Sequence, residues 1–119
     1  MKPLSPSGVT WLLVVAAIFC NATAQVLVKR TAPASALPLQ QWLDPVLATS
    51  VLLYGFSFIL TALVYARLPL SVVSPLMAGA VFVLVALAAV QVFGEVLGPS
   101  RLLGIVLVLA GIGLLARSA

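Results

Sequence analysis

Residues 71–93 read SVVSPLMAGAVFVLVALAAVQVF and contain no charged side chain. As a helix, about 20 apolar residues are enough to cross the ~30 Å hydrocarbon core of a bilayer. Residues 9–29, 46–66 and 100–116 are similarly apolar. Because backbone polar groups in lipid must be satisfied within their own segment, each stretch is predicted to be an α-helix. The sequence therefore predicts an all-α membrane protein, a single domain of four transmembrane helices over residues 1–119.

The composition supports a membrane location. Hydrophobic residues make up 64% of the chain and charged residues 7%, with a mean hydropathy of +1.31. A soluble domain has about 25% charged residues, so this chain has too few charges to cover a surface that faces water. The net charge of +4 comes from basic residues near the ends of the apolar stretches, where they anchor helices at lipid headgroups. Nucleic-acid binding is not expected.

Several chemistries are not expected from the residues present. The chain has no histidine and a single cysteine, Cys20. No metal site, cofactor or internal disulfide is therefore predicted. No nucleophile–base pair can be assembled, so the protein is not expected to be an enzyme.

The charged residues leave the orientation in the membrane open. Residues 30–45 are polar and contain prolines, which indicates a loop with an interfacial turn around Trp42. Four crossings place both termini on one side, and the basic residues then divide three against three: Lys2, Arg67 and Arg117 against Lys29, Arg30 and Arg101. Such a tie gives no orientation by the positive-inside rule. Either the sample of charges is too small, or copies insert both ways and pair antiparallel.

Polar residues form a stripe along the C-terminal part of the first predicted helix. Asn21, Gln25 and Lys29 are spaced four residues apart and share one helix face. Polar groups inside a membrane face a partner helix or a wet cavity. In one interpretation, the two amides form hydrogen bonds between helices and Lys29 anchors the helix at the membrane surface. In the other, the three residues line a transport pathway. The run also resembles a signal-peptide cleavage site and a glycosylation acceptor, but an acceptor belongs on an exposed loop and cleavage would remove a full span.

The second and third helices carry similar groups. One face of the second helix carries Tyr54, Ser57, Thr61 and Tyr65. Tyr65 lies at the helix end, so an interface anchor is the alternative for it. In the third helix, Ser74 precedes Pro75. The proline removes a backbone donor, so it either exposes a carbonyl to a cavity or only kinks the helix for packing.

The fourth helix has no polar residue between Arg101 and Arg117. Gly104 and Gly111 lie on one of its faces, and small residues let helices approach closely in lipid. This pattern predicts a dimer interface, with packing inside the protomer as the alternative.

The stretch FGEVLGPSRLLGI and the helix LLGIVLVLAGIGLL resemble the small multidrug resistance superfamily and the related EamA-type half-transporters. The resemblance extends over nearly the whole chain. It implies a four-helix bundle that dimerises, often with both orientations, and matches Gly104 and Gly111 to the glycines of the dimerisation helix. The drug-exporting branch uses a membrane glutamate where this chain has Asn21, and aromatic residues where it has Ser74 and Met77. Both acidic residues here, Asp44 and Glu95, lie in connections.

A second branch resembles the chain more closely. Ala24-Gln25, Lys29, Ser74-Pro75 and Glu95 are similar to a pattern in the small subunits of the undecaprenyl-phosphate-aminoarabinose flippase. The resemblance implies a transporter of a polyprenyl-phosphate-linked sugar in the bacterial inner membrane, made of one or two kinds of subunit.

We therefore expect a membrane transporter that flips an anionic glycolipid, with Lys29 or Arg30 meeting its phosphate. An exporter of small organic cations or polyamines and a non-transporting helper subunit are the alternatives. The sugar, the energy source and the choice between homodimer and heterodimer stay open. The expected substrate-binding residues are Asn21, Gln25, Lys29, Tyr54, Ser57, Thr61, Ser74 and Pro75.

Overall fold

The computed structural model describes residues 8–31 and 44–118, which form four helices. These are α1 (Gly8–Lys29), α3 (Pro45–Tyr65), α4 (Leu70–Phe93) and α5 (Pro99–Ser118). All four are long and apolar enough to cross a membrane, and their ends lie within two residues of the predicted ranges. The turn predicted around Trp42 lies outside the described residues, as does Lys2.

Local chemistry fixes the helix ends. Asp44 precedes α3, and its Oδ1 accepts a 2.8 Å hydrogen bond from the backbone N–H of Val46. This carboxylate satisfies a donor that a helix start leaves unpaired. α4 ends at Gly94, whose φ of 66° is a left-handed conformation that favours glycine. α4 is continuous through Pro75.

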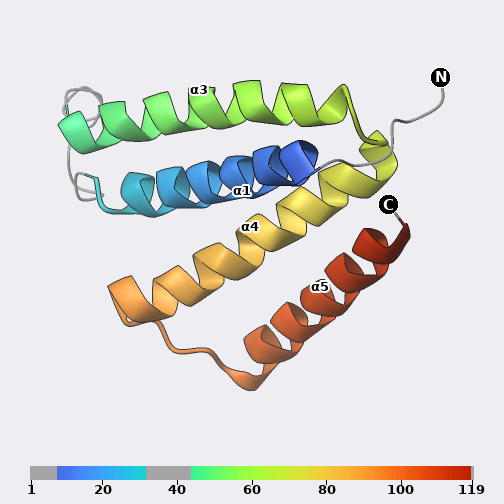
Figure 1. Ribbon diagram of the computed structural model, residues 1–119. Coiled ribbons are helices and arrows are strands. Elements are labelled where there is room, and N and C mark those ends of the chain that lie inside the picture. The colour runs from blue at the N-terminus through green and yellow to red at the C-terminus, as the bar shows by residue number, and fades with distance from the viewer. Residues whose placement is uncertain (1–7, 32–43, 119) are drawn as a thin grey trace.

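Successive helices run in opposite directions, and α1 lies between α3 and α4 (Figure 1). The start of α1 and the end of α5 lie at the same end of the molecule as the α3–α4 connection (Figure 1). Among the described helices, α5 packs mainly against α4. The protein is therefore a three-helix body with a fourth helix attached along one side.

The buried core joins α1, α3 and α4. α1 contributes Val14 and Ala17, which are almost fully buried, and α3 contributes Val64. α4 completes the core with Val73, Leu76, Met77 and Val81. None of the residues that form α5 is buried in the described protomer. In a membrane, α5 consequently faces lipid or a partner over most of its surface.

Gly79 is where α4 and α5 approach closely. A Cβ atom built on this glycine would lie 3.1 Å from side-chain carbons of both Ile112 and Val108. Small residues permit this kind of backbone approach in lipid. The sequence offered no reason to single Gly79 out from the other small residues of its apolar run.

Candidate polar cavity

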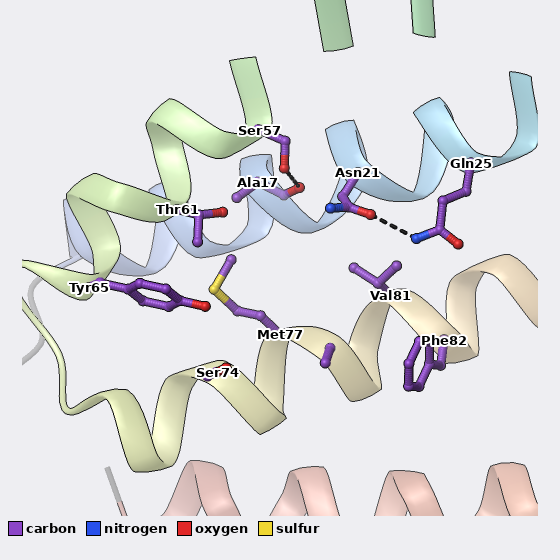
Figure 2. Close-up of a pocket in the computed structure, with 11 residues that line it drawn as sticks. Ala17, Asn21, Gln25, Ser57, Thr61, Tyr65, Ser74, Met77, Val81 and Phe82 are labelled. Carbon is purple, nitrogen blue, oxygen red and sulfur yellow. Dashed lines mark hydrogen bonds between the residues drawn. The ribbon is translucent and has the colours of Figure 1, made fainter. Parts of the chain in front are cut away.

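A cavity of about 270 Å³ lies between α1, α3 and α4. Figure 2 shows side chains from all three helices directed into the space between them. The polar residues that line it are Asn21 and Gln25 of α1, Ser57, Thr61 and Tyr65 of α3, and Ser74 of α4. Met77, Ala78, Val81 and Phe82 of α4 supply an apolar wall. No charged side chain is among the described residues that line this cavity.

The two amides of α1 form a pair. Gln25 Nε2 donates a 2.8 Å hydrogen bond to Asn21 Oδ1, and Figure 2 shows this bond along the cavity side of α1. The four-residue spacing that placed them on one face also allows this contact. Each amide carries a carbonyl and an NH₂ group, so the pair keeps both a donor and an acceptor for a ligand.

Ser57 has a structural task in addition to its place on the cavity wall. Its side chain is 2% exposed, and its Oγ donates a 3.1 Å hydrogen bond to the carbonyl of Ala17. The bond joins α3 to α1 at the middle of the bundle. Such interhelical bonds in membranes contribute about 0.6 kcal/mol on average. Ser57 thus fits the helix-packing role that polar residues in lipid commonly have.

Tyr65, Met77 and Phe82 line the cavity although the sequence reasoning did not propose them as ligand contacts. The ring of Tyr65 is directed from α3 toward Met77 of α4 (Figure 2). Tyr65 lies one turn beyond Thr61 on the same helix face, and this spacing is the feature of the sequence that points to the cavity. Its position at a helix end pointed equally to an anchor at the membrane surface.

Three of the proposed ligand residues lie away from the cavity. Tyr54 is on the same angular face of α3 as Thr61 but nearer the helix start, and its side chain is 38% exposed. Pro75 is exposed and does not line the cavity, whereas its neighbour Ser74 does. Lys29 extends beyond the cavity, toward the α4–α5 connection. The assignment of all eight residues to substrate binding remains a prediction.

Lys29 forms an ion pair with Glu95, through its Nζ and the Oε1 of the carboxylate. Its ammonium also lies 5.0 Å from the centre of the Phe93 ring, within cation–π range. Arg101 Nη1 approaches the other carboxylate oxygen at 4.0 Å. The hydrogen bond and charge of Lys29 lower the pKa of Glu95 below its ordinary value of 4.5, with a smaller contribution from Arg101. Glu95 therefore joins the end of α1 to the α4–α5 turn as a charged group at neutral pH.

The two glycines proposed for a dimer interface have open space around their Cβ positions in the described protomer. A Cβ atom at Gly104 or Gly111 would have no atom within 4 Å. The small size of these residues is therefore not needed for packing among the described helices. The dimer interface itself stays a prediction.

Two comparisons with known proteins cover most of the chain. The family model described as Small Multidrug Resistance protein matches residues 9–108. The uncharacterized protein y4nH of Sinorhizobium fredii is 32% identical over 114 residues, which cover 93% of this chain and 97% of y4nH. No solved structure matches the chain significantly.

Proposed function

Because the chain belongs to the small multidrug resistance family of membrane transporters, we propose that it flips a polyprenyl-phosphate-linked sugar across the bacterial inner membrane. The family match supports the general function, which is transport by a small multi-pass membrane protein. The choice of cargo is supported by the uncharged, hydrogen-bonding character of the cavity between α1, α3 and α4.

A sugar is recognised by neutral donors and acceptors, which the lining of this cavity provides. The Asn21–Gln25 amide pair, the Thr61 and Ser74 hydroxyls and the Tyr65 phenol surround the same space. These groups would replace the water that hydrates a sugar as it crosses the hydrocarbon core, where unpaired polar groups are costly. The hydrocarbon chain of the cargo would stay in lipid, so the protein needs to shelter only the polar head.

A cation exporter would call for different chemistry. A lipophilic or polyamine cation in a dry site needs a negative partner. The two acidic residues of the sequence are Asp44 and Glu95. Asp44 caps α3 and Glu95 is paired with Lys29. Neither lines the polar cavity, which favours a cargo with a neutral, hydrogen-bonding head over a cation.

Dimers are typical of this family, and we propose that two copies, or this chain and a related subunit, pair through the Gly104–Gly111 face of α5. The open space beside both glycines in the protomer supports this choice. An antiparallel pair would place two polar cavities about a midplane, as inverted repeats do in other transporters.

The proposal is tested in proteoliposomes that contain a fluorescent, short-chain polyprenyl-phosphate sugar. Flipping is followed as loss of fluorescence to a quencher that cannot cross the bilayer. We expect Asn21→Leu and Gln25→Leu each to slow flipping by about tenfold or more, because each removes a hydrogen-bonding group from a dry site. Thr23→Val is the matched control, since Thr23 is exposed and does not line this cavity.

Each alternative function has its own outcome. Transport of tetraphenylphosphonium or spermidine without flipping of the glycolipid would identify an exporter. Wild-type flipping rates in both leucine variants would remove the polar cavity from the transport path. No transport by the protein alone, with activity restored by a second subunit, would indicate a heterodimer.

A further inference from the structure

A second hollow lies between α4 and α5, and its chemistry is opposite to that of the polar cavity. It measures about 340 Å³. Small residues, Ala86 and Ala89 of α4 and Gly104 of α5, alternate in its lining with larger apolar ones such as Ile105. A groove that is apolar along its length and formed by the least buried helix suits a hydrocarbon chain.

One end of this α4–α5 groove carries charge, contributed by Glu95 and Arg101. The carboxylate of Glu95 is already engaged by Lys29. In the described part of the chain, the contacts of Arg101 are a 4.0 Å approach to Glu95 and a 3.5 Å hydrogen bond to the Val96 carbonyl, and both use Nη1. A guanidinium has five N–H donors, so its remaining donors can bind an anion. With Lys29 and Arg101 beside Glu95, this end of the groove keeps a net positive charge.

The groove continues the polar cavity along one face of α4. Ser74, Ala78 and Phe82 line the cavity at four-residue spacing, and Phe82 and Ala86 line the groove at the same spacing. Phe82 therefore borders both spaces. A chain that lay in the groove with its charged head at Arg101 would point its other end toward Phe82 and the polar cavity.

We propose that the α4–α5 groove binds the carrier chain of a polyprenyl phosphate, with the phosphate on Arg101 and the isoprenoid chain on the small residues of α4 and α5. This site would hold the lipid in one leaflet before or after its polar head enters the cavity. The inference rests on the proposed function, because the bound lipid is the carrier part of the proposed cargo.

Three features favour this occupant. The planar guanidinium of Arg101 matches a phosphate with paired hydrogen bonds. The groove is a single apolar hollow that leads from the charged end at Arg101 toward Phe82, which matches one hydrocarbon chain attached to a phosphate. Its α5 wall is not buried by the described helices, so a lipid can enter sideways from the bilayer.

The test uses full-length dimeric protein in nanodiscs of zwitterionic lipid and farnesyl phosphate that carries a photoreactive diazirine on its chain. We expect labelling to map to residues 82–89 and 102–108. Arg101→Gln should weaken binding by about tenfold, because it removes a charge-assisted contact to phosphate. Arg117→Gln, at the other end of α5, should leave affinity within about twofold, since it lies outside the groove.

A second pair of variants tests the chain site. Gly104→Leu adds a side chain where a Cβ atom has open space, so the protein should fold while labelling of the groove falls by about tenfold. Gly113→Leu is the control, because Gly113 also has open space around its Cβ position and lies on the same helix, outside the groove and off the proposed Gly104–Gly111 face. Farnesol, which lacks the phosphate, should compete poorly with farnesyl phosphate.

Labelling that maps to the polar cavity would overturn the proposed lipid site. Equal effects of Arg101→Gln and Arg117→Gln on binding would overturn it as well. Competition by a diacyl phosphatidic acid that equals competition by farnesyl phosphate would also contradict a site for a polyprenyl phosphate. Gly104→Leu could dissociate the dimer without changing the labelling, which would assign the groove to a second copy. Flipping assayed on the same protein separates the two proposals: intact labelling without flipping would reject the transport function and keep the lipid site.

Discussion

At the scale of single residues, Gly79 sets how closely α5 approaches the bundle. Its missing side chain is replaced by Ile112 and Val108, with carbon atoms 3.1 Å from the built Cβ position. Gly79→Leu should therefore lower the free energy of unfolding by about 1–3 kcal/mol, the usual cost of overpacking. Chemical unfolding in mild detergent measures this, with Gly55→Leu as control because Gly55 has open space around its Cβ position. Equal losses in both variants would contradict a close α4–α5 contact.

The ion pair between Glu95 and Lys29 predicts how the stability of the folded protein changes in acid. The pKa of Glu95 is lowered in the folded protein by the hydrogen bond and charge of Lys29. A lowered folded-state pKa contributes stability that is present above the unfolded-state pKa and is lost as the pH falls through the folded-state value. Between about pH 8 and about pH 5 the Lys29–Glu95 pair should therefore contribute a constant amount.

Below about pH 4.5, the apparent melting temperature of the wild-type protein should fall more steeply than that of Glu95→Gln. The glutamine variant cannot titrate at this position, so it serves as the reference curve. Parallel curves for the two proteins over this acid range would show that the ion pair does not contribute to the stability of the fold.

At the scale of elements, the start of α3 depends on the Asp44 carboxylate, which accepts a hydrogen bond from the Val46 N–H. Asp44→Ala should cost about 0.5–2 kcal/mol, the usual loss for a missing N-cap. Asp44→Asn retains a side-chain oxygen and should cost far less. Hydrogen exchange at the amides of residues 46–48 reports the change locally, and equal exchange in the alanine and asparagine variants would show that the cap is not needed.

The helices could be predicted from the sequence because lipid imposes both their length and their secondary structure. The same reasoning placed Asn21, Gln25 and Thr61 toward the interior, and they do line one cavity. Tyr54 shows its limit. Helical spacing gives the angle of a side chain around the helix axis, but it does not give the extent of the cavity along that axis, which Tyr54 does not reach. That extent depends on how whole helices pack, and α3 and α4 diverge toward the start of α3 (Figure 1).

The Lys29–Glu95 pair shows a second limit. The sequence predicts Lys29 as an anchor and places Glu95 in a connection, but the two residues are 66 positions apart. Their meeting depends on α1 reaching the same end of the bundle as the α4–α5 turn. An ion pair between residues that are distant in the sequence leaves no periodic pattern, so the sequence alone does not reveal it.

For the whole molecule, the distribution of basic residues predicts insertion in both orientations. Lys29, Arg30 and Arg101 lie at one end of the described bundle, and Arg67 and Arg117 lie at the other. A reporter fused after Ala119 should be active on both sides of the membrane, because no excess of positive charge selects one side. Adding two lysines after Arg117 should place most copies with that end in the cytoplasm. A reporter found on one side before and after this change would exclude dual insertion.

The position of α5 at the outside of the bundle separates two tasks that a compact protein usually combines. No described residue of α5 lines the polar cavity, and α5 packs mainly against α4 in the described protomer. Selection can therefore change the choice of pairing partner without disturbing the residues of the polar cavity that would recognise the head of the cargo. A chimera that carries the α5 helix of a related transporter should exchange its assembly partner and keep its specificity for the polar head, provided that Arg101 and the close contact at Gly79 are retained. In such a family, new pairs of subunits can arise by exchange of a single helix.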